Sequence, residues 1–205
     1  MQFRVDLEGH GREDLWDGIN ISRTVGWFTS IYPVVLEIQS SFHPGDALKA
    51  IKEQMRRIPK RGMSYGLSRY LADAAHREQL RSLPPSDVLF NYLGQFDQLF
   101  TDSTLFRVAQ ESSGLSRSSK GHRSHLLIIN GMVVGGKLQL QWTYSEALHR
   151  RTTIETVAQS CLEGLRELIA HCQSPEAGGF TPSDFPLLRQ FDQSQLDRAL
   201  SRVKF

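Results

Sequence analysis

Residues 3–13 read Phe-Arg-Val-Asp-Leu-Glu-Gly-His-Gly-Arg-Glu, and this stretch decides how the start of the chain folds. Apolar residues alternate with polar ones here, so Phe3, Val5 and Leu7 share one face of a predicted β-strand. Glu8 follows at the end of that strand, before a loop with two glycines, where the backbone can approach another molecule closely. The pattern therefore predicts a carboxylate presented at a strand terminus, and Glu8 is the first candidate for acid–base chemistry.

The remaining periodicities predict an α/β fold. Apolar residues at helical spacing predict helices over 46–58, 65–83, 152–172 and 193–202. Stretches rich in β-branched and aromatic residues predict strands over 25–38 and 87–95, and a hairpin of 125–133 with 137–144. Thr152 and Glu155 have the spacing of a capping box at the start of the longest helix. Strands and helices in this order predict a mixed sheet flanked by helices.

The chain divides into one compact unit and a tail. We expect a single domain over 1–174, because 205 residues are enough for one core. Residues 175–205 are expected to form an extended strap that ends in a short helix. Residues 101–124 are rich in serine and poor in large apolar groups, so we predict that they are the least stable part of the fold. Limited proteolysis should cut them first, near Arg117, Lys120 or Arg123.

The composition argues against several classes of function. A net charge of +2 gives no electrostatic case for nucleic-acid binding. No apolar run approaches the ~20 residues of a membrane span. The first residues lack the apolar core of a signal peptide, so a cytoplasmic location is expected. His122 and His125 have no third metal ligand at a recognisable spacing, and neither a nucleotide-binding loop nor a serine-hydrolase motif is present.

The only cysteines, Cys161 and Cys172, both fall in the predicted helix 152–172. Their separation along a helix is roughly 16 Å, whereas a disulfide needs Cα atoms within about 7 Å, so an intrachain bridge is excluded. Both positions continue the apolar stripe of the helix, and we therefore expect two buried free thiols.

Three motifs resemble a known family. They are Glu-Gly-His-Gly-Arg-Glu at 8–13, Arg-Thr-Val-Gly-Trp-Phe-Thr at 23–29 with the Tyr-Pro pair at 32–33, and Phe-Asn-Tyr-Leu-Gly-Gln-Phe-Asp at 90–97. Their order and spacing resemble the C-terminal half of the epimerization domains of nonribosomal peptide synthetases, which are relatives of condensation domains. The resemblance implies one lobe similar to chloramphenicol acetyltransferase, which meets a second such lobe at a tunnel.

The resemblance also implies a reaction and its partners. An epimerization domain converts the α-carbon of an aminoacyl or peptidyl thioester from L to D, with one acid–base group on each side of that carbon. Glu8 is implied as one of these groups. The other is a histidine of a His-His-x-x-x-Asp-Gly motif in the N-terminal lobe, which this chain lacks. The implied partners are a peptidyl carrier protein and the missing N-terminal lobe. Because the phosphopantetheine arm belongs to the carrier, we expect this chain to bind no cofactor.

Other residues of the motifs are candidates, each with a plainer alternative. Tyr92 is implied to hydrogen-bond a developing enolate or to relay a proton, and Asn91 to lie near the reaction chamber. An ordinary strand tyrosine with a solvated hydroxyl is the alternative for Tyr92. His10 and Arg12 either orient the catalytic carboxylate and line the thioester tunnel, or form structural salt bridges. Trp27 is expected in the tunnel wall and in core packing rather than in the chemistry.

Two other functions stay open. A fragment of a condensation domain would form amide bonds between carrier-bound substrates, although that class generally lacks the motif at 8–13. A catalytically inactive module would still bind a carrier protein or the missing lobe. We expect the isolated chain to expose an apolar patch where the other lobe docks, because interfaces between domains bury roughly 600–1,500 Å².

Overall fold

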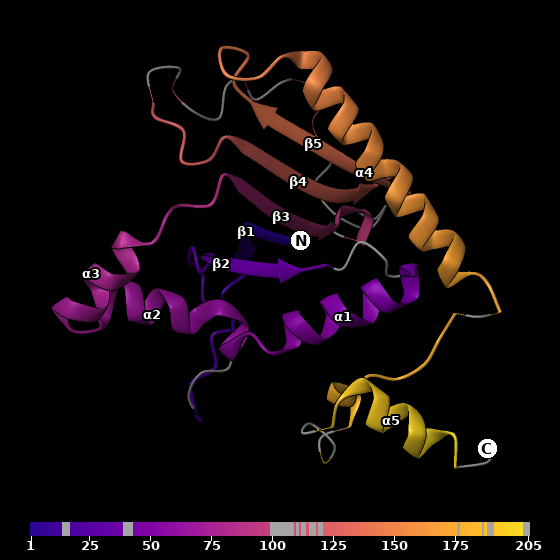
Figure 1. Cartoon of the computed structure of the whole chain (residues 1–205). Helices are drawn as coiled ribbons and strands as arrows, with labels where there is room; N and C mark the ends of the chain where they lie inside the picture. Colours follow the sequence, from indigo (N-terminus) through magenta and orange to yellow (C-terminus); the bar gives the residue numbers. More distant parts are fainter. Residues whose placement is uncertain are drawn as a thin grey trace.

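The computed structural model describes residues 1–13, 17–38, 43–98, 121–175, 177–185 and 191–202, together with the single residues 109, 111, 114, 118 and 187. Five strands form one sheet in the order β2-β1-β3-β4-β5 (Figure 1). Their bounds are Gln2–Gly9 for β1, Ser30–Glu37 for β2, Val88–Gln95 for β3, Leu127–Val134 for β4 and Lys137–Tyr144 for β5. The outer pairs β1–β2 and β4–β5 run antiparallel, whereas β3 runs parallel to both β1 and β4. The predicted mixed sheet and its hairpin are confirmed.

The helices follow the predicted order with one exception. They are α1 Pro44–Arg56, α2 Met63–Leu71, α3 Ala74–Ser82, α4 Arg151–Cys172 and α5 Gln193–Leu200, with 3-10 turns η1 Pro59–Gly62, η2 Phe96–Gln98 and η3 Pro182–Asp184. The single helix predicted over 65–83 is wrong. The backbone of Ala72 is extended, and Asp73 begins α3 as its N-cap because its carboxylate accepts a hydrogen bond from the His76 amide.

Two further local predictions need correction. The capping box of Thr152 and Glu155 does not form, because Arg150 is the N-cap of α4 and the Glu155 carboxylate pairs instead with Arg151 Nε at 2.7 Å. The segment 25–29 precedes β2 rather than forming part of it. Most of the serine-rich segment 101–124 lies outside the described residues, so its early cleavage stays a prediction.

One face of the sheet, the helix face, is covered by α1, α2 and α4. At its β2 end, Val5, Tyr32 and Val34 form a buried cluster. This cluster packs against side chains that α1, α2 and the residues between them supply, namely Met55, Ile58 and Tyr65. At the β5 end, side chains of β5 and α4 line one small cavity, namely Trp142, Tyr144, Ile154 and Ala158. The apolar alternation of β1 thus points toward the helices, as the sequence predicts.

The opposite face of the sheet is more polar, and we call it the Glu8 face. Residues that are direct partners across neighbouring strands share a face, and side chains alternate between faces along each strand. The register therefore assigns to this face Arg4, Asp6 and Glu8 of β1, Leu89 and Asn91 of β3, Ile128 and Asn130 of β4, and Gln141 and Thr143 of β5.

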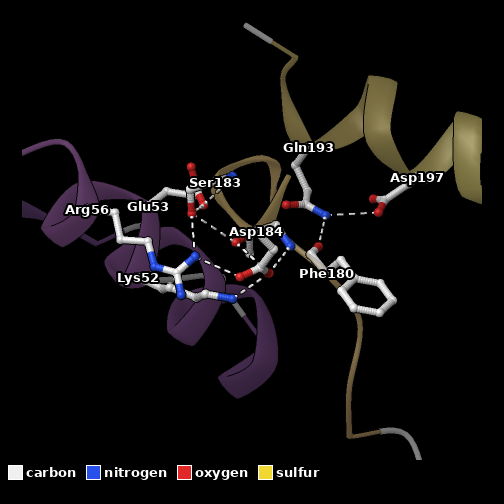
Figure 2. Close-up of polar contacts among 9 residues, drawn as sticks. Lys52, Glu53, Arg56, Phe180, Ser183, Asp184, Gln193 and Asp197 are labelled. Carbon is white, nitrogen blue, oxygen red and sulfur yellow. Dashed lines mark hydrogen bonds and ion pairs between the residues drawn. The ribbon is translucent and has the colours of Figure 1, made fainter. Parts of the chain in front are cut away.

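The C-terminal strap docks on α1 through a network of charged side chains (Figure 2). Asp184 accepts from Lys52 Nζ at 2.6 Å and from Arg56 Nη1 at 2.7 Å. Ser183 donates through its hydroxyl to Glu53 of the same helix. Beyond this turn, Leu196 of α5 is fully buried. The strap predicted over 175–205 is therefore held against the helical layer by specific contacts at 181–184.

Removing the Asp184 carboxylate is expected to loosen the strap. Hydrogen bonds from Lys52 and from the Thr181 amide, with a further one from Arg56, hold the pKa of Asp184 well below its usual range. In Asp184→Ala we expect amide hydrogen exchange in α5 to accelerate by about tenfold, because several charge-assisted bonds are lost together. A carboxyl whose folded pKa is lowered stabilises the fold above its ordinary pKa and loses that effect in acid. The exchange rates of α5 in wild type and in the variant should therefore become equal as the pH falls below about 4. Equal exchange rates at pH 7 would contradict the role given to this network.

Both thiols are free, as expected, but the prediction that they are buried is wrong. Cys161 and Cys172 are exposed, because the buried stripe of α4 is narrower than its apolar pattern and Ile154 is the one residue of this helix that is buried. Among the described residues, no group of side chains is arranged to hold a metal ion. No helix in the described part of the chain combines the length and apolar character needed to cross a bilayer.

Candidate active site at the end of β1

Glu8 lies at the place where the sheet opens into the glycine loop. It is half-buried and is the next-to-last residue of β1. In the parallel ladder its direct partner is Asn91 of β3, so two candidates that lie far apart in the sequence become neighbours. Adjacent strands lie about 5 Å apart, which places both side chains within reach of one small substrate group.

A row of polar residues continues from Glu8 across the sheet. Asn91 pairs with Asn130 of β4, and Asn130 pairs with Gln141 of β5. Sequence reasoning missed Asn130 and Gln141, although an asparagine between the apolar residues of β4 is a local sign. The row places a carboxylate beside side-chain amides. The carboxylate can exchange a proton, and the amide NH₂ groups can donate hydrogen bonds.

The loop after Glu8 is fixed to the segment that precedes β2. Gly11 has a φ of +69° and lies against the Phe28 carbonyl. Arg12 donates to the Ile21 carbonyl at 2.7 Å, and its guanidinium stacks 4.3 Å from the centroid of the Phe28 ring. His10 accepts from the Arg12 amide at 3.0 Å through Nδ1. These contacts of His10 and Arg12 hold the loop together. They are hydrogen bonds and a ring contact, which do not decide between the two alternatives for these residues, so both stay predictions.

Tyr92 and Trp27 do not accompany Glu8 in this row. Alternation along β3 turns Tyr92 to the helix face, where its ring lies beside Gly131 and Leu140. Its side chain is 52% exposed, so its role in proton relay stays a prediction. Trp27 is 88% exposed, and the expectation that it packs in the core is wrong. A place in a tunnel wall would require another lobe to cover it.

Asp97, the last residue of the motif at 90–97, stabilises a neighbouring turn. Asp97 accepts hydrogen bonds from the amides of Gly135 and Gly136, at 2.6 and 2.8 Å. These two glycines form the β4–β5 turn and have positive φ angles. The Gly136 amide, followed by the Gly135 amide, lowers the pKa of Asp97. Asp97 therefore ties the end of β3 to the hairpin that carries Asn130 and Gln141.

Replacing Asp97 by Asn is expected to weaken this turn. An amide oxygen can serve one backbone donor, but the side chain no longer offers two charged acceptors to the two glycines. Since the folded pKa of Asp97 is lowered, the difference in unfolding free energy should be present at pH 7 and disappear as the pH falls below about 4. Urea unfolding at several pH values measures it. Asp87→Asn, an exposed carboxylate just before β3, is the matched control, and a pH-independent difference would contradict this assignment.

Comparison with known proteins identifies the class. Residues 1–186 match the family model of the condensation domain, and the chain belongs to that family. It is 49% identical to one of the linear gramicidin synthase proteins of Brevibacillus parabrevis over 97% of this chain. It is also 45% identical to chondramide synthase of Chondromyces crocatus over 97% of this chain. The chain spans only 3% and 5% of the length of these two relatives.

A match to a solved structure is more specific than the family match. The crystal structure of the epimerization domain from the third module of tyrocidine synthetase B matches with a TM-score of 0.74 at 36% identity. The match covers 83% of this chain and 37% of that one. The resemblance drawn from the three motifs is confirmed, including the fit to the C-terminal half and the chloramphenicol-acetyltransferase-like lobe. The chain is thus a partial condensation-superfamily domain of the nonribosomal peptide synthetase type.

Proposed function

We propose that this chain is the C-terminal lobe of an epimerization domain, in which Glu8 exchanges a proton with the α-carbon of a carrier-bound aminoacyl or peptidyl thioester. The observation that carries the proposal is the register pair of Glu8 and Asn91 at the end of the parallel ladder, on the Glu8 face. The likeness to a solved epimerization domain supports it. The substrate arrives on the phosphopantetheine arm of a peptidyl carrier protein, which is the proposed partner.

The chemistry follows from the row of polar side chains. The α C–H bond breaks as its proton moves to a base on one face, and the electron pair passes into the thioester carbonyl as an enolate. A proton then returns to the carbon from the opposite face, which inverts the centre. Glu8 supplies one acid–base group, and amide donors of Asn91 and Asn130 can stabilise the enolate oxygen. The second group is the histidine of an N-terminal lobe.

Amide-bond formation is the second candidate, because the matching family model is that of the condensation domain. This reaction needs two carrier-bound substrates and no exchange at the α-carbon. The two candidates therefore differ in one observable, which is the uptake of deuterium at the α-carbon of a single loaded carrier.

Reconstitution with an N-terminal lobe tests the proposal. The isolated chain is expected to leave the α-proton of a loaded carrier in place, because only one face of the carbon meets a base. Mixed with a lobe that carries the histidine motif, it should catalyse deuterium uptake and give D-amino acid in chiral analysis. Product with a new amide bond from two loaded carriers, without deuterium uptake, would favour condensation. Binding of the carrier with neither reaction would favour the inactive module.

A further inference from the structure

The pairing between β1 and β3, which we call the seam, is the shortest in the sheet and lies beside Glu8. β1 forms eight register pairs with β2, and β4 forms eight with β5, but β1 and β3 share only three. Glu8 and Asn91 make the last of these three pairs, so the two sides of the proposed site lie on opposite sides of the β1–β3 seam. The relative position of Glu8 and Asn91 therefore depends on the contacts that hold β1 against β3.

A hydrogen-bonded contact between His125 and Asp6 crosses this seam on the same face. His125 Nε2 lies 2.9 Å from Asp6 Oδ2, and the two side chains are 8% and 19% exposed. Asp6 is two residues before Glu8 on β1, whereas His125 lies just before the start of β4. The contact therefore reaches from β1 past β3. A second bond across the seam, from Arg4 to the Pro85 carbonyl at 2.6 Å, lies further from Glu8.

The buried surroundings of the contact between His125 and Asp6 make it costly to break. The register row of Asp6 continues through Leu89 and Ile128, which are 4% and 7% exposed. Removing one member of a pair in such a place leaves an uncompensated charge or an unpaired polar group. Ser124 Oγ lies 2.9 Å from Nδ1 of His125, so both ring nitrogens are engaged and the ring is held in one orientation.

We propose that Asp6 and His125 are positioning residues that hold β1 in register with β3, so that Glu8 stays opposite Asn91. The catalytic part of this inference rests on the proposed function, whereas its structural part concerns the chain alone. His125 does not act on the substrate, since its two nitrogens are bound to Ser124 and Asp6 and its side chain is buried.

Hydrogen exchange in the 205-residue chain tests the structural part. His125→Leu should accelerate exchange of the amides that pair β1 with β3 by about tenfold or more, and leave those of the β4–β5 hairpin unchanged. His125→Gln should preserve protection, because its amide nitrogen can still donate to Asp6. His122→Leu is the matched control at an exposed position. Should His125→Leu fail to fold, Asp6→Asn provides the milder version. Equal acceleration in both parts of the sheet, or none, would overturn the inference.

Turnover in the reconstituted pair tests the catalytic part. Misplacement by about 1 Å can cost on the order of 100-fold in rate, so His125→Leu should lower kcat to that extent. KM for the loaded carrier should change little, and His125→Gln should restore kcat. A change in KM alone would overturn the positioning role. The proposed function fails separately, because it depends on whether Glu8 itself is needed.

Discussion

Replacing Glu8 by Gln is expected to abolish epimerization by the reconstituted pair while fold and carrier binding persist. The amide keeps the size of the side chain and loses only its ability to exchange a proton. A positioned acid–base group contributes about 10²- to 10⁴-fold, so deuterium uptake at the α-carbon should fall by that factor. Chiral analysis of the released amino acid should show the L form.

Tyr92→Phe provides the comparison for this experiment. It removes a hydroxyl from the opposite face of the sheet and leaves Glu8 and Asn91 in place, so we expect a smaller loss of rate. Circular dichroism and carrier binding should match wild type in both variants. Normal epimerization by Glu8→Gln would make the central assignment wrong, and activity of the isolated chain would show that one lobe contains both bases.

Replacing Gly11 by Ala is expected to have the largest effect on stability. The added Cβ would overlap the Phe28 carbonyl oxygen, and the φ of +69° strains any residue with a side chain. Left-handed backbone costs roughly 1–2 kcal/mol and a displaced neighbour about 1–3 more, so we expect a loss of about 3 kcal/mol in the free energy of unfolding. Urea unfolding of the whole chain measures it.

Gly18 offers a matched control for this variant. Its φ is +85°, but a Cβ at this position would meet nothing within 4 Å. Gly18→Ala therefore carries the backbone strain without the overlap, and should lose only about 1–2 kcal/mol. The difference between the two losses in unfolding free energy measures the cost of the overlap with Phe28 alone. Equal losses would show that the loop can move away from the Phe28 carbonyl at little cost.

The elements of this fold could be predicted from local patterns, but the arrangement of the site could not. Alternation in β1 and helical spacing in α4 are visible within a few residues. The neighbours of Glu8 are set by parallel registers that join positions 8, 91 and 130, and no local pattern encodes such a register. Gln141 and the His125–Asp6 pair were missed for this reason, whereas Asn130 was missed although its place between the apolar residues of β4 is a local sign.

Some errors arose although a local signal was present. Asp73 is a good N-cap, and it splits the helix that apolar spacing alone made continuous. The importance of Glu8 came from the family resemblance, since a carboxylate at a strand end is by itself an ordinary solvated group. The exposure of Trp27 could not be predicted from its motif, because an apolar side chain does not reveal whether its own lobe or another one covers it.

The exposed thiols of α4 affect how the solution mass of this chain should be measured. Cys161 and Cys172 are free and open to solvent, so air oxidation can join two copies through an intermolecular disulfide. Such a covalent dimer would sediment like a pair of lobes held together by uncovered apolar surface. A dimer that persists in reductant, or in a chain with both cysteines replaced by serine, is the one that reports on the expected apolar patch.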